Sequence, residues 1–512
     1  MSPGTPLGAP RGTRPRGALS RSGSILAALV LSSLACHSAT PRPSPLVVLI
    51  PSSPVSLVPN ASSEDVTETV LQNVYEPLVD LDPTLRLGPG LAESWYTQGG
   101  SWIFHLRPHV LWHDGSPLLA KEVVAALERA RTDTGSELPS ELASVRAIAA
   151  PDATTVTIQA LESFEALPLR LADILIWKVG AKGALVGTGP YRLGEATRGD
   201  VALEAFLQYH GGAPRIPRVL FRPVASPSYR ARLLEEEKAQ LVSDLPPSEA
   251  RSLRSRVHVQ AIPGLRVFLL VPSCRPLPDN PFKDLRVRRA LSLAIDRAAL
   301  MRSLGGEAEA VRGIATRGEL GGDSQSAPLP RPDLPTARSL LVDARYPEGF
   351  DVAMDAAQKY PGMDGLVLEL TRELAAVGIR VHTTFRETPD FVTRVMRQES
   401  ALYVIGWKSD TGDSRVSYES LLHSQTGPFG VYNGGAYADS VMDGLIERAS
   451  RASTSDGLDQ VFEALDDRVK ERLPLIPLLR PYDLYGLAPG LDFVPRLDRR
   501  LRLVDAAWRD GP

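Results

Sequence analysis

The sequence predicts an α/β protein built from two or three domains. Its 512 residues exceed what a single hydrophobic core organises. Apolar residues make up 43% of the chain and charged residues 23%, which is the composition of an ordinary globular protein. Short continuous apolar runs, typical of buried strands, alternate with segments whose apolar residues recur at helical spacing. This order favours sheets flanked by helices.

The first 36 residues predict an export signal that lies outside the fold. A short apolar run at 25–31 follows a basic region and leads through small residues to Cys36. The run is too short to span a bilayer as a stable helix. It resembles a bacterial lipoprotein signal, which implies lipidation at Cys36, although Ser33 stands where such signals usually have Leu. The alternative is a conventional cleavage nearby that releases a soluble protein. The arginines of the basic region are Arg11, Arg14, Arg16 and Arg21.

Residues 37–45 are rich in Pro, Ser and Thr and predict an extended tether. The other cysteine of the chain is Cys274, so lipidation of Cys36 excludes an intramolecular disulfide, and we expect a buried or partly buried thiol at Cys274. The net charge of -3 provides no basic footprint for nucleic acid, which is therefore not expected as a partner. No second stretch is apolar enough to predict a transmembrane helix.

The N-terminal part predicts alternating strands and helices. In order, it predicts a strand at 46–50, a helix that opens at 62–65, an extended segment at 75–79, an aromatic strand followed by a tight turn at 113–115, and a helix from Pro117. Ser and acidic residues open the first helix, as in a capping sequence. In the second helix, Val123, Val124 and Leu127 share the predicted apolar face.

The C-terminal part continues the pattern. The run 280–297 predicts a helix whose core face comprises Val287, Ala290, Leu291, Ala294 and Ile295. Residues 352–356 predict a strand, and 377–381 predict a helix end that turns into a strand, with Gly378 as the C-terminal cap. Residues 401–405 predict a buried strand, after which Gly406 lets the backbone turn.

The strand at 401–405 points to a binding site at its carboxyl end. Trp407, Asp410 and Asp413 emerge there, and in sheets flanked by helices this edge usually holds small ligands. An aromatic wall beside a carboxylate suits a small cationic ligand such as an amine. The alternative is that Trp407 belongs to the core and Asp410 caps the next turn.

Enzymatic and metal chemistry lack a matching pattern. Gly187 and Gly189 are followed by Pro190, and this segment lacks the third glycine of a dinucleotide-binding loop. Neither a nucleophile elbow nor a Walker sequence occurs. His105, His109 and His113 are spaced by four, but Pro108 argues against one helix carrying all three. We therefore expect no catalytic residue, no metal and no cofactor.

A series of motifs resembles family 5 of the extracellular solute-binding proteins, the peptide and nickel class. The motifs are Asn-Val-Tyr-Glu-Pro-Leu at 73–78, Leu-Ala-Glu-Ser-Trp at 91–95, Phe-His-Leu-Arg-Pro at 104–108, His-Asp-Gly-Ser-Pro-Leu at 113–118, Gly-Thr-Gly-Pro-Tyr-Arg at 187–192 and the run 280–297. Their order matches over roughly residues 46 to 510. Such proteins capture a ligand outside the cytoplasmic membrane and pass it to an ABC importer.

The resemblance implies a type II-like periplasmic-binding-protein fold of the large cluster, with an extra domain and a ligand cleft between two lobes. The implied division is lobe I at 46–74, 180–265 and 480–512, the extra subdomain packed on lobe I at 75–179, and lobe II at 266–479.

The resemblance also assigns site residues. Peptide binders end a strand in Gly-Trp-x-x-Asp, here 406–410, so Asp410 would pair with the ligand's terminal ammonium. Asp413 would be a supporting acidic residue. Lys359 stands roughly where dipeptide binders place the Arg for the opposite end of the ligand. Tyr432 and Asn433 would line the cleft wall of lobe II.

The function implied is a periplasmic or otherwise extracytoplasmic lipoprotein, anchored through Cys36, that captures short peptides as a monomer and delivers them to ABC permease subunits. The alternatives are another solute, such as a nickel chelate, an opine or a sugar, or a lipid-anchored envelope enzyme or sensor. The chain departs from the family pattern at Leu119, where a helix-capping Thr is usual, and at 235–238 and Arg345, where Gly is usual.

Overall fold

The computed structural model describes residues 45–62, 64–133, 142, 145–160, 167–195, 199–315, 331–357, 362–409, 413–427, 429–451 and 455–509. The described residues belong to one compact unit. The predictions for Cys36, Lys359 and Asp410, and for nearly all of the tether, concern positions outside the described residues.

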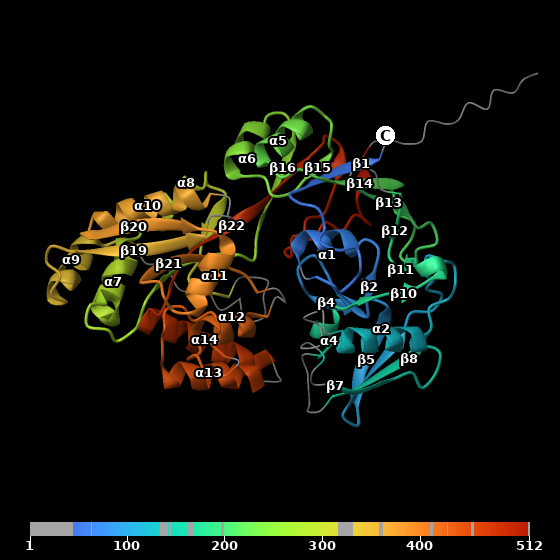
Figure 1. The fold of residues 1–512 in the computed structure, drawn as a ribbon, viewed down its shortest axis with the longest axis horizontal. Coiled ribbons are helices and arrows are strands. Elements are labelled where there is room, and N and C mark those ends of the chain that lie inside the picture. Colours follow the sequence, from blue (N-terminus) through green and yellow to red (C-terminus); the bar gives the residue numbers. More distant parts are fainter. Residues whose placement is uncertain are drawn as a thin grey trace, which may run out of the picture. The chain divides into compact units, whose positions relative to one another are not determined.

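A twelve-stranded mixed sheet is the main element of the fold (Figure 1). Its strand order is β12-β13-β14-β1-β15-β22-β17-β21-β19-β20, and β16 and β18 also pair with β22. The strands are β1 (Leu46–Ile50), β12 (Tyr191–Leu193), β13 (Val201–Ala205), β14 (Arg218–Pro223), β15 (Leu241–Val242), β16 (His258–Pro263), β17 (Val267–Pro272), β18 (Ala308–Ala310), β19 (Phe350–Ala357), β20 (Ile379–Arg386), β21 (Leu402–Trp407) and β22 (Ile476–Leu487). The predicted strands at 46–50, 352–356 and 401–405 are confirmed, apart from Ala401.

Strand β22 divides the sheet into two halves. Its first part pairs with β17 and β18, and from Tyr482 onward it pairs with β16 and β15. We call β1 and β12–β16 the first half-sheet, and β17–β21 the second half-sheet. The chain crosses between them within β22 and again at 264–266, the link from β16 to β17.

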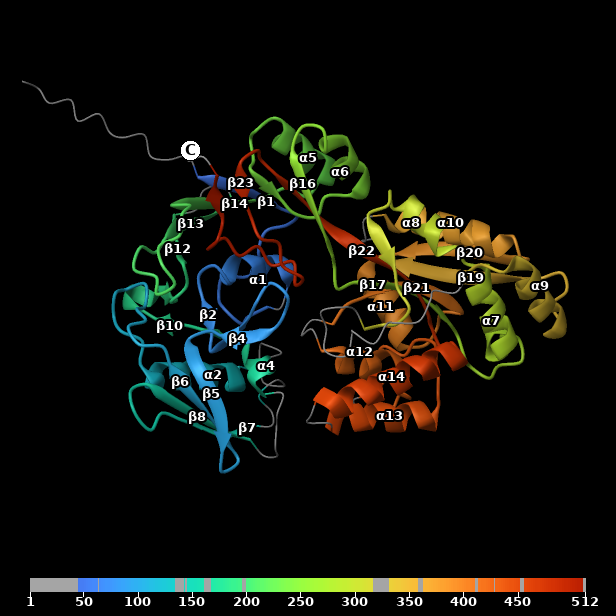
Figure 2. The same ribbon diagram turned by 180° about the vertical axis from the view of Figure 1, so that it is seen from behind.

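Helices flank both half-sheets (Figure 2). They are α1 (Asp65–Leu71), α5 (Pro227–Glu235), α6 (Pro247–Leu253), α7 (Leu285–Ala294), α8 (Arg297–Ser303), α9 (Leu334–Asp343), α10 (Met363–Ala375), α11 (Thr388–Met396), α12 (Ser414–Leu422), α13 (Ser440–Arg451) and α14 (Ser455–Arg472). On β17, Leu270 packs in one hydrophobic cluster and Leu269 in another, so both faces of this strand are buried. A continuous apolar run is the sequence pattern of such a strand.

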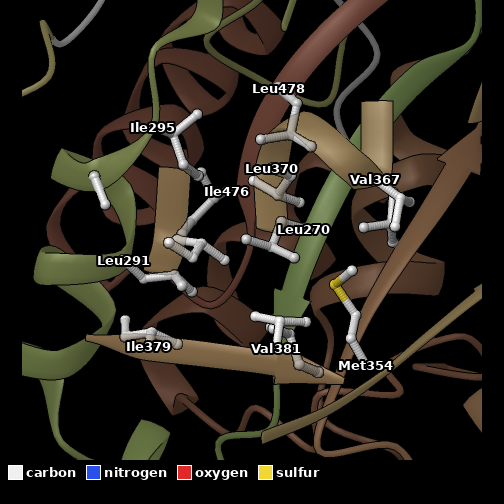
Figure 3. Packing of buried hydrophobic residues seen from close by; sticks show 14 of the residues in the cluster. Leu270, Leu291, Ile295, Met354, Val367, Leu370, Ile379, Val381, Ile476 and Leu478 are labelled. Atoms are coloured by element: carbon white, nitrogen blue, oxygen red, sulfur yellow. The ribbon is translucent and has the colours of Figure 1, made fainter. Parts of the chain in front are cut away.

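The largest hydrophobic cluster lies against the second half-sheet (Figure 3). Leu291 and Ile295 from the α7 segment and Leu370 from α10 pack against Met354 of β19 and Leu270 of β17. All five core residues predicted in the run 280–297 are buried.

A smaller sheet of order β5-β6-β8-β7 has its own hydrophobic core together with α2 and α4. These elements are β5 (Ala92–Gln98), β6 (Ser101–Leu106), β7 (Val145–Ala149), β8 (Thr155–Ala160), α2 (Ala120–Thr132) and α4 (Leu167–Leu171). Two-stranded pairs complete the description: β2 (Glu76–Pro77) with β9 (Leu175–Ile176), β3 (Val79–Leu81) with β4 (Leu87–Pro89), β10 (Lys178–Val179) with β11 (Leu185–Val186), and β23 (Leu491–Asp492) with β24 (Ala507–Trp508).

Two predicted helices differ from the structure. The helix predicted from Pro117 begins at Ala120, because Pro117 forms a β-bridge with Leu111 and keeps the preceding segment extended. Leu119 has no capping side chain, and its N–H instead donates to Glu122 Oε2 at 3.0 Å. The helix predicted over 280–297 is broken: a 3-10 turn at Pro281–Lys283 precedes α7, and extended backbone at Ile295 separates α7 from α8.

The motif at 73–78 contacts the motif at 187–192 directly. Tyr191 N–H donates to Asn73 O at 2.9 Å, and Gly189 N–H donates to Val74 O at 3.0 Å. A Cβ at Gly187 would lie 2.1 Å from Val74 O. The glycine at 187 is therefore required by close backbone approach.

Candidate functional site

The carboxyl end of β21 carries the predicted site residues. Gly406 lies within the strand, paired with Phe268, so the prediction that it turns the backbone is wrong. A Cβ at Gly406 would lie 3.0 Å from Arg266 Cδ and 3.0 Å from Phe268 Cε1. The absent side chain leaves room for Arg266, whose Nη1 donates to Gly406 O at 3.1 Å.

Trp407, the last residue of β21, is held in one orientation from two sides. Its indole N–H donates to Ser417 Oγ on α12 at 2.9 Å. Its ring meets that of Tyr432 edge-on, with centroids 5.2 Å apart. The side chain is only partly buried and packs at the border of a hydrophobic cluster. Trp407 therefore combines packing with a fixed, partly exposed aromatic surface, which suits either interpretation of this residue.

Beyond Trp407, Ser409 and Asp413 are joined by two hydrogen bonds. The Ser409 hydroxyl donates to Asp413 O at 3.0 Å and accepts from Asp413 N–H at 3.1 Å. Ser409 is 1% exposed. The predicted Asp410 lies between these two residues in the sequence.

Asp413 is the N-cap of α12. Its Oδ1 accepts from the Arg415 N–H at 3.0 Å, and the Arg415 guanidinium reaches its carboxylate at 2.8 and 2.6 Å. The residue is 6% exposed. A buried carboxylate with these bonds serves the fold, and a contact of Asp413 with ligand stays a prediction.

Asn433 and Tyr432 differ in their surroundings. The Asn433 amide donates to His423 O at 2.9 Å and to Tyr437 O at 2.8 Å, and its Oδ1 accepts from Tyr437 N–H at 3.1 Å. Asn433 thus ties its own loop together. Tyr432 is partly exposed beside Trp407, so it remains the better placed of the two to line a site.

Sequence reasoning missed an ionic group next to Trp407. Lys408 Nζ lies 2.9 Å from Asp65 Oδ1 in the first turn of α1. Burial raises the pKa of Asp65, but the charge and hydrogen bond of Lys408 outweigh it and hold the pKa below its usual value. The residues are 343 positions apart, and no local pattern links them.

Asp483 of β22 belongs to the same electrostatic environment. Its carboxylate lies 3.1 Å from Arg499 Nε. Burial raises the pKa of Asp483 to about 7, the positive charges of Arg266 and Lys408 oppose this rise, and the negative charge of Asp65 adds to it. Asp483 lies in β22, the strand that joins the half-sheets.

The three histidines spaced by four have separate surroundings. His105 lies on β6 beside the ring of Tyr96, and His109 has a left-handed backbone with a φ of 61°. His113 Nε2 lies 3.0 Å from Gly189 O, and burial lowers its pKa. Among the described residues, no three His, Cys, Asp or Glu side chains are placed to hold a metal ion.

Cys274 is a partly buried free thiol, as expected, and burial raises its pKa. Within the part of the chain that the structure describes, no helix has the length and apolar character needed to cross a membrane.

Comparisons with known proteins agree with the fold and with the order of the motifs. The family model of bacterial extracellular solute-binding proteins, family 5 Middle, matches residues 86–429. The glutathione-binding protein GsiB of Escherichia coli K12 is 26% identical over 459 residues, which cover 85% of this chain and 88% of that protein.

Two solved structures have similar folds. The ABC transporter substrate-binding protein CtaP of Listeria monocytogenes has a TM-score of 0.80 at 18% identity, over 91% of this chain and 99% of that chain. DppA of Helicobacter pylori, in complex with the peptide STSA, has a TM-score of 0.71 at 19% identity, over 91% and 98%. The predicted fold class, a type II periplasmic-binding-protein fold with two lobes, is confirmed.

Proposed function

Because the chain belongs to family 5 of the bacterial extracellular solute-binding proteins, we propose that it captures short peptides between its two lobes and delivers them to an ABC permease. A solute-binding protein of this family releases its ligand unchanged. The chain is therefore a binding protein of an ABC transporter and not an enzyme.

The peptide assignment rests on the residues at the carboxyl end of β21. Trp407 is a fixed, partly exposed aromatic surface there. Asp410 follows it by three positions in the sequence, between Ser409 and Asp413, which are hydrogen-bonded to each other. An aromatic face beside a carboxylate attracts an ammonium group. Asp410 is proposed as the partner of the peptide's terminal ammonium.

A peptide ligand also fits the relatives. The relatives from Shigella flexneri and Escherichia coli K12 are named glutathione-binding proteins, and glutathione is a γ-linked tripeptide that carries an ammonium group and carboxylates. Burying both charged ends of such a ligand is costly unless each end is paired. We therefore propose Lys359 as a candidate for the carboxylate end, with Tyr432 on the cleft wall, and we expect affinity to depend on ligand length.

Attachment to the membrane belongs to the same proposal. Lipidation at Cys36 would hold the folded body near the permease through the tether at 37–45. The lobe division at 46–74, 180–265 and 480–512 against 266–479, with 75–179 as the extra subdomain, is likewise proposed.

The test is calorimetric titration of the protein that begins after the signal, with Cys36→Ser so that it is soluble. Dipeptides, tripeptides, tetrapeptides and glutathione are compared with an opine, a nickel–histidine chelate and a disaccharide. We expect one length class of peptide to bind at micromolar Kd or tighter. Binding of a non-peptide solute alone would disprove the peptide assignment and leave the importer class intact.

The site is tested with Asp410→Asn. Removing the charge should weaken binding of the best peptide by tenfold or more, because the ammonium would lose its charged partner. Asp459→Asn, on an exposed face of α14, is the matched control. Equal affinity of Asp410→Asn and wild type would reject the ammonium role.

A further inference from the structure

The ion pair between Lys408 and Asp65 joins the two half-sheets beside the candidate site. We propose that Lys408 is a positioning residue, which holds the lobes near one another through Asp65 and so favours ligand capture. This inference rests on the proposed function, because it concerns how the lobes come to enclose a peptide.

Each partner is mounted on a rigid element. Asp65 lies in the first turn of α1, whose Val66 and Val70 are buried in a cluster with Val48 of the first half-sheet. Lys408 directly follows β21 in the second half-sheet. The ion pair therefore forms only when the two separately packed cores lie close enough for Asp65 and Lys408 to meet.

The backbone around Lys408 leaves little freedom. Trp407 before it is held by Ser417, and Ser409 after it is bonded to Asp413. The Lys408 side chain is 22% exposed, against 49% for that of Asp65. Since the lysine is already ordered on one side and partly shielded from water, less entropy is lost on pairing than for a typical surface ion pair.

Two single backbone segments connect the half-sheets. One is β22 near Pro481, and the other is 264–266, where Gly264 N–H donates to Pro481 O at 3.2 Å. Two strand-like connections bend more easily than a packed interface does. The attraction between Asp65 and Lys408 acts between the two half-sheets close to these crossings. It lowers the free energy of lobe arrangements in which the two side chains can meet, and this stabilisation is absent when the lobes are farther apart.

Several charged groups face this pair. Asp483 of β22 lies in the electrostatic field of Arg266, Lys408 and Asp65, and it pairs with Arg499 at 3.1 Å. Arg499 also pairs with Asp244, which follows β15. Loss of the lysine charge should raise the pKa of the Asp483 carboxyl further, whereas loss of the Asp65 charge should lower it.

The experiment measures lobe separation in the ligand-free protein. Spin labels are placed at Leu207 and Leu368, which are 74% and 73% exposed and belong to opposite halves, in a background of Cys36→Ser and Cys274→Ser. Pulsed dipolar spectroscopy then gives the distance distribution. We expect Lys408→Met and Asp65→Asn to broaden it toward longer distances, and Lys408→Arg to leave it as in wild type.

Peptide affinity provides the second readout. Lys408→Met and Asp65→Asn should each raise the peptide Kd by about two- to fivefold, the range expected for a single ion pair. The exchange Lys408→Asp with Asp65→Lys should recover most of the loss. Lys238→Met breaks an exposed pair with Glu236 inside one lobe and is the matched control, expected to change neither readout.

The outcomes separate the two proposals. Unchanged distances in both Lys408→Met and Asp65→Asn, in a protein that binds peptide, would overturn the positioning role alone. Broadened distances in a protein that binds no peptide would reject the peptide assignment and retain the contact between the lobes. A Kd that rises in both single variants but does not recover in the exchanged pair would also reject the positioning role.

Discussion

The hydroxyl of Ser409 bonds to both backbone groups of Asp413, donating to the carbonyl oxygen and accepting from the N–H. One buried side chain thus joins the segment that directly follows β21 to the N-cap of α12. The placement of this N-cap therefore depends on a residue that need not touch ligand.

Ser409→Ala tests this link. The change removes the hydroxyl that accepts from Asp413 N–H and donates to Asp413 O, while Asp413 O keeps its bond from Val416 N–H at 3.2 Å, so we expect the free energy of unfolding to fall by about 1–2 kcal/mol. Urea denaturation measures the loss, and peptide titration measures the accompanying drop in affinity. Ser303→Ala, which removes a hydroxyl bonded to a carbonyl one turn back in α8, is the control. Stability equal to wild type would contradict the role of Ser409.

Arg345→Gly should stabilise the protein. Arg345 is exposed and has a φ of 72°, a left-handed conformation that costs a side-chain-bearing residue about 1 kcal/mol relative to Gly. Thermal and urea unfolding should show a gain of that order. Arg345→Ala is the control, because it removes the same side chain but keeps the strained Cβ. A gain shared by both variants would mean that the guanidinium, not the backbone, was unfavourable.

Gly187→Ala should severely destabilise the fold. The added Cβ would meet the backbone oxygen of Val74 at 2.1 Å, and neither backbone segment can move without breaking the bonds that join 73–74 to 189–191. We expect a loss above about 3 kcal/mol or failure to fold. Gly444→Ala on α13 meets open space and should instead gain up to about 1 kcal/mol. A mild effect at 187 would show that the motifs pack more loosely than described.

Asp483 should contribute stability that is lost as pH rises from about 4 to 7. Its folded pKa of about 7 lies above the ordinary value of 3.8, so the folded state binds the proton more tightly than the unfolded chain. The contribution is fully present below the unfolded pKa and is lost as pH rises through the folded pKa. Burial raises the pKa of Glu68 and Glu373 to about 7 as well, with the same sign.

The measurement is urea unfolding between pH 4 and 8. Asp483→Asn should flatten the slope over this window, because the amide does not titrate. The comparison concerns the slope, since the variant also loses the pair with Arg499. Asp459→Asn should leave the slope unchanged. Parallel curves for wild type and Asp483→Asn would mean that this carboxyl titrates near its ordinary value.

Cys36→Ser tests the proposed anchor in cells. If Cys36 carries lipid, the wild-type protein should sediment with membranes and incorporate labelled fatty acid, and the variant should do neither. Cys274→Ser, which removes the partly buried thiol, is the control and should remain membrane-bound. Equal labelling of wild type and Cys36→Ser would exclude lipidation at this residue.

Local pattern was sufficient for many elements and failed where tertiary contacts intervened. The strand at 46–50 is buried along almost its whole length, so its composition alone identified it. The break between α7 and α8 had no such signal, because Ile295 is apolar at helical spacing but is extended next to Asp296, the cap of α8. The same holds at Gly406, where the contact of the strand with Arg266 decides why glycine is needed.

The sequence by itself determined the fold class and the family resemblance, because motif order and apolar runs are properties of neighbouring residues; it also predicts a site at the end of β21. The tertiary structure alone decided which charges meet. Lys408 pairs with Asp65 across 343 positions, and Asp413 is engaged by Arg415 and Ser409. The physical reason is that the pKa of an ionisable group and the energy of its ion pairs depend on its burial and on its neighbours in space. These are set only when distant segments pack together.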